Sequence, residues 1–203
     1  RMDYLNNLPS LDSEVKNIES KINMGQKYWR ERYYYHTMNI VSKEDKDRLC
    51  YDYLKTLNWT YLYYFSECPT YHWSYNYSYG PSLLDIYEYI KNTNNFDINA
   101  YKFSKKYIPS PLVQLLSILP QNSYKLLPEE AQHLFGKMSP LSIYYPKDYS
   151  LEMLFKKYYW MCEPKLPIID LDYIKLVADQ ISISQKHKKR FTKQRLFIKE
   201  KTE

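Results

Sequence analysis

The chain has 203 residues, of which 44% are hydrophobic and 26% charged, and its formal net charge is +6. This length and composition suit one domain or two small ones with a substantial core, and they exclude a fibrous or disordered chain. Because no apolar run approaches the roughly 18 residues of a membrane span, and no signal peptide opens the chain, we expect neither a membrane protein nor a secretory precursor.

The residue usage indicates the origin and compartment of the chain. There are 25 tyrosines but 3 glycines, and asparagine, lysine and isoleucine are also frequent. These frequent residues share A/T-rich codons, so we interpret the bias as that of an AT-rich genome, such as that of a large DNA virus. Cys50, Cys68 and Cys162 are too few and too scattered for a disulfide framework, which favours a reducing compartment.

Three helices are predicted in the N-terminal part of the chain. Over residues 10–23, apolar residues recur at spacings of three and four, with Ser10 or Asp12 available as the N-cap. A second helix is predicted over residues 26–38 and a third over 43–66, ending before a proline. On the third helix, residues at helical spacing form one stripe that we expect to be buried: Cys50, Tyr53, Leu54, Leu57, Tyr61, Tyr64 and Phe65.

An aromatic loop is predicted after the third helix. Residues 69–81, PTYHWSYNYSYGP, have no helical period, are bracketed by prolines and carry Gly80 near their end. Helical signals return over residues 82–91, and residues 92–99 form an asparagine-rich break. We therefore expect the loop to be an ordered segment between two helices.

The rest of the chain is predicted as short helices separated by irregular segments. Residues 112–119 lie between two prolines, and residues 127–135 carry a proline suited to a first helical turn. We expect residues 139–149 to be irregular, 170–183 to form an amphipathic helix, and 186–203 to form a basic helix or tail.

These elements predict a mainly α-helical fold. The sequence has no internal repeat and no sustained alternation of period two, so we expect an irregular multi-helix domain that contains the ordered aromatic loop. We place this domain at residues 1–185, followed by the basic segment 186–203.

The sequence carries no signature of a catalytic site. It lacks a glycine-rich phosphate loop, a metalloprotease helix motif, a nucleophile elbow and a paired Cys-x-x-Cys. Asp170 and Asp172 could hold a divalent ion, but we favour Asp170 as a helix cap and Asp172 as a first-turn residue. Cys68 and His72 have the spacing of half a zinc site without a second pair, so we favour a structural role. No catalytic or metal-binding residue is predicted.

Two features of the sequence favour nucleic-acid binding. The basic C-terminal run suits contacts with phosphate but equally fits a solvated tail. Rings of the aromatic loop could stack on unpaired bases, although physical reasoning alone favours packing against a core. The run contains Lys186, His187, Lys188, Lys189, Arg190, Lys193 and Arg195, and the loop contains Tyr71, His72, Trp73, Tyr75, Tyr77 and Tyr79.

The aromatic loop and the helix before it carry a family resemblance. Residues 53–81, YLKTLNWTYLYYFSECPTYHWSYNYSYGP, closely resemble a segment of the Xrn/Rat family of 5′→3′ exoribonucleases. In that family, a tyrosine-rich helix leads through Gly-Cys-Pro into a loop rich in tryptophan and tyrosine. Residues 28–34, YWRERYY, are similar to the charged run ahead of that helix. Glu67 stands in place of the family's glycine.

Four later blocks follow in the family's order. Residues 111–120, PLVQLLSILP, resemble PFEQLLAVLP, and residues 123–134 resemble the Leu-Leu-Pro segment after it. Residues 139–146 are similar to an SPIIDFYP-like stretch. Residues 156–170 resemble a pattern of two lysines, a tryptophan and then proline-isoleucine-aspartate.

The resemblance, strongest over residues 28–172, implies both a role and a missing part. Family members hydrolyse RNA with a 5′-monophosphate one nucleotide at a time, using Mg²⁺ or Mn²⁺ held by acidic residues of an N-terminal region. The matched blocks all belong to the second, helical region, which packs beside the catalytic domain and narrows the entrance to a single strand. The resemblance thus implies that this chain binds no metal and is inactive alone. Its implied partners are single-stranded RNA and a catalytic domain on the same or a companion polypeptide.

We therefore predict the helical region of a viral or similarly AT-rich 5′→3′ exoribonuclease, in the cytoplasm rather than the nucleus. The alternatives are a non-catalytic RNA-binding or adaptor protein derived from this fold, and a structural domain whose tyrosines are all core. Arg30 and Arg32 are predicted to contact either phosphate or the catalytic domain. The predicted nucleic-acid-binding residues are Trp73, Tyr71, Tyr75, Arg30, Arg32, Lys188, Lys189 and Arg190.

Overall fold

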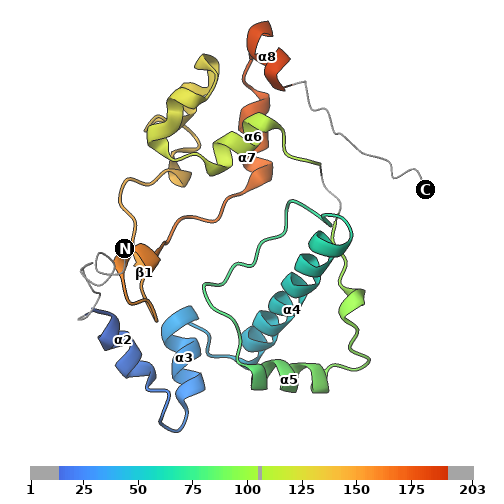
Figure 1. The fold of residues 1–203 in the computed structure, drawn as a ribbon, viewed down its shortest axis with the longest axis vertical. Coiled ribbons are helices and arrows are strands. Elements are labelled where there is room, and N and C mark those ends of the chain that lie inside the picture. Colours follow the sequence, from blue (N-terminus) through green and yellow to red (C-terminus); the bar gives the residue numbers. More distant parts are fainter. Residues whose placement is uncertain (1–13, 105–106, 192–203) are drawn as a thin grey trace, which may run out of the picture. The chain divides into compact units, whose positions relative to one another are not determined.

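The computed structural model describes residues 14–104 and 107–191 and is mainly α-helical, which confirms the predicted fold class (Figure 1). The chain divides into two compact units. The first consists of Arg1–Lys106 and Ser150–Lys165, and the second of Tyr107–Tyr149 and Leu166–Glu203. Each unit is therefore built from two separate stretches of sequence. No helix in the described part of the chain is long and apolar enough to cross a membrane.

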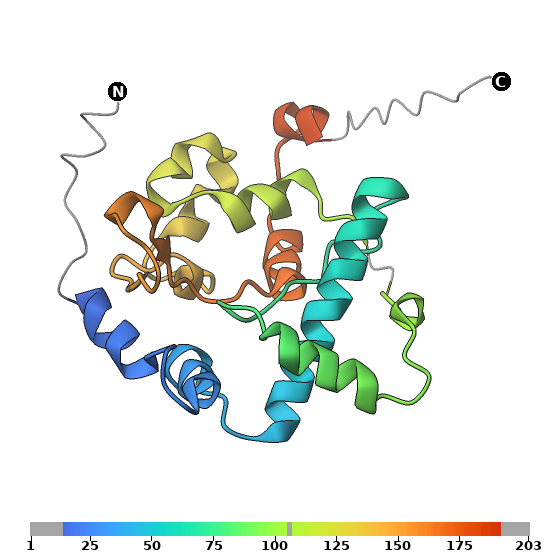
Figure 2. The same ribbon diagram turned by 60° about the horizontal axis from the view of Figure 1, so that its bottom comes forward.

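The first unit contains the predicted N-terminal helices, α2 (Glu14–Ile22), α3 (Trp29–Met38), α4 (Lys43–Phe65) and α5 (Leu83–Asn92), and a short 3₁₀ helix, η1 (Ile98–Ala100). α2 packs on α3, and α4 on α5 (Figure 2). The side chains of Ser42 and Ser82 cap α4 and α5 by accepting backbone N–H groups of their first turns. α3 begins later than predicted, because the residues before it form a turn ending at Tyr28 with φ 64°. Residues 10–13 of the first predicted helix lie outside the described chain.

The buried face of α4 differs from the predicted stripe. Leu49, Cys50, Leu54 and Asn58 are buried. Leu57, however, is 46% exposed, and the other exposed stripe residues are Tyr61, Tyr64 and Phe65. The prediction was wrong for these four because α4 carries apolar or aromatic residues on more than one side. Helical spacing alone does not determine which side the neighbouring elements cover.

A small core and a polar network join α3, α4 and α5. Tyr34 and Leu49 are fully buried, with Ile40 beside them. The Tyr34 hydroxyl donates to Asp85 Oδ2 at 2.6 Å and accepts the Ser82 N–H at 2.8 Å. The buried hydroxyl of α3 thus pairs with the first turn of α5, which leaves neither partner unsatisfied.

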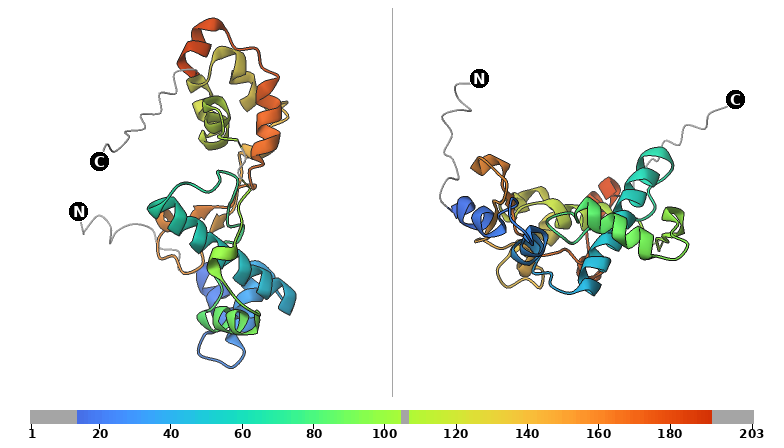
Figure 3. Two further views of the ribbon diagram at one scale, coloured as in Figure 1. Left: turned by 90° about the vertical axis from the view of Figure 1, so that its right-hand side faces the viewer. Right: turned by 90° about the horizontal axis from the view of Figure 1, so that it is seen from below.

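The second unit is built around an aliphatic core. Its elements are α6 (Pro111–Ile118), η2 (Gln121–Leu126), η3 (Glu129–Phe135), η4 (Ser142–Tyr144), α7 (Leu171–Asp179) and α8 (Gln185–Phe191). α6 packs directly on α7 (Figure 3). The core contains Leu112, Val113, Leu116, Leu127, Ala131, Leu134, Phe135, Leu141, Tyr145, Ile174, Val177 and Ala178.

The structure corrects three local predictions. Residues 127–135 form the 3₁₀ helix η3 rather than an α-helix, because a short segment between Pro128 and Gly136 gains little from α-helix propagation. The helix predicted to end at Ile183 ends at Asp179. A two-stranded antiparallel sheet, β1 (Leu151–Glu152) with β2 (Glu163–Pro164), was not predicted, because strands of two residues produce no alternation.

Candidate nucleic-acid interface

The aromatic loop, residues 69–81, is an ordered part of the first unit, as predicted. Its rings at positions 73, 75, 77 and 79 are half-buried, whereas Ser74, Asn76 and Ser78 between them are exposed. This alternation follows from extended backbone, in which successive side chains point to opposite sides. Tyr75 and Tyr77 pack on the small core. The inner side of the loop is therefore aromatic and the outer side small and polar.

Tyrosine hydroxyls hold the loop in place. Tyr75 donates to the Tyr79 carbonyl at 2.8 Å, Tyr33 donates to the Gly80 carbonyl at 3.0 Å, and Tyr79 donates to Glu152 Oε1 at 2.7 Å. Burial raises the pKa of Tyr75 and of Tyr79, so both phenols remain neutral donors. The hydroxyl of Tyr75 thus has a role within the fold, and its predicted contact with nucleic acid stays a prediction.

Trp73 is half-buried against α4. Its indole N–H donates to Thr56 Oγ1 at 3.1 Å, and its ring meets Phe103 edge to face with the centroids 6.2 Å apart. The Lys55 ammonium lies 4.2 Å from the Trp73 ring centroid, at cation–π distance. Tyr71, by contrast, is 50% exposed. The two predicted stacking rings thus differ in how openly they present a face.

Arg30 and Arg32 both lie on α3 and both have partners within the first unit. Arg30 Nη1 is 3.2 Å from Asp85 Oδ1. The Arg32 guanidinium donates to backbone carbonyls at the end of α2 and in the following turn, with Nε to Ile22 at 2.9 Å and Nη1 to Lys27 at 2.8 Å. These bonds pair carbonyls that the helix end leaves free. Contacts of either arginine with phosphate or a catalytic domain stay predictions.

The basic C-terminal residues begin on α8. Lys188 is exposed there, whereas the side chains of Lys189 and Arg190, and all of residues 192–203, lie outside what the structure describes. Glu130 holds the start of this segment, because its Oε1 accepts the Ser184 N–H at 3.1 Å and its Oε2 lies 3.2 Å from His187 Nδ1. Hydrogen bonds from its own backbone N–H and from Ser184 lower the pKa of Glu130 to about 2.

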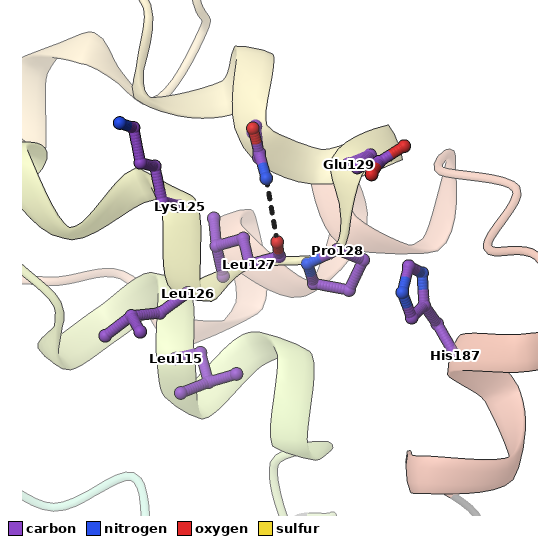
Figure 4. A pocket seen from close by; sticks show the side chains of 8 residues that line it. Leu115, Lys125, Leu126, Leu127, Pro128, Glu129 and His187 are labelled. Atoms are coloured by element: carbon purple, nitrogen blue, oxygen red, sulfur yellow. Dashed lines mark hydrogen bonds between the residues drawn. The ribbon is translucent and has the colours of Figure 1, made fainter.

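His187 also lines a pocket of about 340 Å³ in the second unit (Figure 4). Leucines form part of its lining together with Pro128, and Lys125 and Glu129 add charges of opposite sign. Gln132 donates to the Leu127 carbonyl at 3.1 Å beside it. This mixed lining does not favour one class of ligand over another.

A second ring cluster, residues 156–161, was not singled out from the sequence. The Tyr158 and Trp160 rings are parallel within 11°, with centroids 6.2 Å apart, and Trp160 is 62% exposed. Lys157 Nζ lies 5.1 Å from the Tyr158 ring centroid. Exposed parallel rings beside a cation are suited to stacking on bases next to a phosphate. The signal available in the sequence was the run KKYYW, in which lysines directly precede rings.

The small sheet connects this cluster to the aromatic loop. Glu152 on β1 accepts the Tyr79 hydroxyl and pairs with Lys165 Nζ at 2.8 Å. Burial would raise the pKa of Glu152, but the hydrogen bonds from Lys165 and Tyr79 outweigh it, and the net effect lowers that pKa.

The chain's acidic, histidine and cysteine residues do not fit a metal site. Among residues 14–104 and 107–191, no group of three or more such side chains could hold an ion. Asp170 instead caps α7, accepting the Tyr173 N–H at 3.0 Å, as the favoured interpretation predicted. No reaction step can therefore be assigned to a metal on the described residues.

The chain is similar to proteins of one family. A family model described as the Xrn1 helical domain matches residues 3–203. The chain is 32% identical over 161 residues to 5′-3′ exoribonuclease 2 of Kluyveromyces lactis, which covers 76% of the chain and 15% of that relative. It is 30% identical over 171 residues to 5′-3′ exoribonuclease 2 of Arabidopsis thaliana, covering 82% and 16%. For the 5′-3′ exoribonuclease 2 homolog of Caenorhabditis briggsae, identity is 28% over 196 residues, covering 93% and 19%. The chain thus spans less than a fifth of the length of these relatives.

Proposed function

The chain belongs to the family of Xrn helical domains, and from this membership we propose that it supports the 5′→3′ degradation of RNA by a catalytic domain outside the chain. The observation that carries the proposal is the family match over residues 3–203, together with relatives whose printed name is 5′-3′ exoribonuclease 2. The proposed substrate is single-stranded RNA with a 5′-monophosphate.

The proposed role of this chain is to bind and guide the strand. Exposed rings, Tyr71 and Trp160, would stack on bases, which is worth about 1 to 3 kcal/mol per base by alanine substitution. Lys157 and the basic residues of α8 would contact phosphates, which makes affinity fall as salt rises. Arg30, which already pairs with Asp85 on α5, would lie at the face toward the catalytic domain.

The proposed metal, Mg²⁺ or Mn²⁺, is assigned to the catalytic domain. When bound there, such ions activate the attacking water and stabilise the leaving oxygen. The described residues of this chain do not fit such a site, so their contribution is limited to binding and orienting RNA. We further propose an intracellular location, in the cytoplasm rather than the nucleus, and a viral origin based on the AT-rich residue usage.

The proposal is tested by comparing two purified proteins, the 203-residue chain and the longest polypeptide that its gene encodes. Each is incubated with Mg²⁺ or Mn²⁺ and with RNA labelled at its 3′ end, carrying either a 5′-monophosphate or a 5′-hydroxyl. We expect only the longer polypeptide to shorten the RNA, and only the monophosphorylated form. A longer polypeptide that binds RNA without shortening it would instead support the adaptor function, and shortening by the chain alone would contradict the assignment of catalysis elsewhere.

A further inference from the structure

Lys55 on α4 lies inside a box of three aromatic rings in the first unit. Its Nζ is 4.2 Å from the Trp73 ring centroid, 5.4 Å from that of Phe103 and 5.8 Å from that of Tyr51. Trp73 comes from the aromatic loop, Phe103 from the segment after η1, and Tyr51 from α4 itself, one turn before Lys55. All three centroids lie within the distance at which a ring attracts an ammonium.

The walls of this ring box are fixed by contacts of their own. The Trp73 N–H is bonded to Thr56, and the Trp73 and Phe103 rings meet edge to face at 71°. Tyr51 meets Tyr101 edge to face, with centroids 4.9 Å apart. Rings held in this way form a rigid site, which reduces the ordering cost of binding a ligand.

The Lys55 ammonium has its charge available for an anion. Within the described part of the chain, no carboxylate lies at ion-pair distance from Lys55, and ring faces are its recorded contacts. Asp52 acts on it only from farther away: burial raises the pKa of Asp52, although Lys55 and Arg48 oppose this shift. Lysine carries three donors, and a ring face does not use them as a phosphate oxygen would.

We propose that Lys55 and Trp73 form one nucleotide-contact site, in which the ammonium pairs with an RNA phosphate and the indole face stacks on the neighbouring base. The inference rests on the proposed function, which makes single-stranded RNA the ligand. In the free chain the ammonium lies over the indole face. On binding, the base takes that place and the ammonium moves to the phosphate, so stacking and ion pairing replace the cation–π contact.

Lys55→Met is the central test, because it removes the charge and keeps the length of the side chain. Affinity of the 203-residue chain for a fluorescent 12-nucleotide single-stranded RNA is measured by anisotropy over a range of KCl concentrations. One lost phosphate contact should reduce the slope of log affinity against log salt by about 0.7. Lys46→Met is the matched control, because Lys46 Nζ lies 5.3 Å from the ring of Tyr34 on the same helix and should leave the slope unchanged.

A second measurement separates the base contact from the phosphate contact. Trp73→Ala should weaken binding of the RNA about tenfold but have little effect on an oligomer of abasic ribose phosphates. Lys55→Met should weaken binding of both oligomers. Lys55→Arg, which keeps the charge, should retain the wild-type salt slope, and Lys55→Gln repeats the test if Lys55→Met does not fold.

Each outcome decides the inference. An unchanged salt slope in Lys55→Met, with RNA binding intact, would overturn the Lys55 contact and leave the proposed function in place. Equal losses for Trp73→Ala on normal and abasic oligomers would overturn the stacking contact. A wild-type chain that binds no single-stranded RNA would overturn this inference together with the RNA contacts in the proposed function.

Discussion

In the first unit the buried cluster contains Tyr34, Ile40 and Leu49 and is surrounded by tyrosines, whereas in the second unit the buried cluster is mostly aliphatic. Tyrosine hydroxyls of the first unit bond to carbonyls and carboxylates far along the chain, as Tyr79 does to Glu152. In the second unit, Leu112, Leu116 and Ile174 are enclosed on all sides.

This difference indicates how work is divided between the units. Aliphatic packing encloses whole side chains, so it contributes stability and leaves little for a ligand to contact. Packing through tyrosine and tryptophan places one part of a ring inside and another part at the surface, with a polar handle bonded. We therefore expect the second unit to show the largest losses of stability and the first unit to show the losses of binding.

The largest expected effect is in the aliphatic core. Leu116→Ala removes a fully buried side chain of α6, and the cavity should lower the free energy of unfolding by about 2 to 5 kcal/mol. Urea unfolding followed by circular dichroism measures the loss. Leu57→Ala, at a half-exposed position of α4, should change it by less than about 1 kcal/mol. Equal losses for the two variants would contradict the burial assigned to α4.

The next effect tests the polar network of the first unit. Tyr34→Phe keeps the ring but deletes the hydroxyl between Asp85 and the Ser82 N–H, and should cost about 1 to 3 kcal/mol. The control is Tyr35→Phe, because Tyr35 is exposed on the same helix. If both variants unfold at the same urea concentration as the wild type, the network does not hold α3 to α5.

A binding variant should then reverse the stability result. Trp160→Ala removes an exposed ring, so we expect the free energy of unfolding to change little and single-strand affinity to fall about tenfold. Trp160→Phe should restore most of the affinity. Tyr64→Ala, at an exposed ring of α4, is the matched control and should bind like the wild type. A melting temperature lowered as much as in Leu116→Ala would show that Trp160 is a packing residue.

The smallest expected effect depends on pH. Because the pKa of Glu152 is lowered below its ordinary value of 4.5, its contribution to stability is fully present above that pH and is lost as the pH falls through the folded-state pKa. Glu152→Gln should therefore cost about 1 kcal/mol at pH 7, and less at pH 3. Glu163→Gln, at a more exposed partner of Lys156, should show little difference at either pH. A cost for Glu152→Gln that does not depend on pH would assign the effect to packing instead of charge.

The sequence by itself determined the helical class, the cores of most helices, the ordered aromatic loop and the family. These features depend on information within a few residues. Ser42, Ser82 and Asp170 accept N–H groups three positions ahead, so the helix starts could be predicted from local chemistry. The family resemblance likewise depends on short blocks in a fixed order.

Only the tertiary structure decided which side of α4 is buried and what the site residues contact. α4 has rings on several sides, and packing by α3 and the aromatic loop, distant in sequence, selects the side containing Leu49 and Leu54. Arg32, predicted as a partner for phosphate, donates to carbonyls at the end of α2. The Trp73 face carries the Lys55 ammonium because a loop and a helix meet there. Such contacts arise from long-range packing, which residue spacing within one element does not encode.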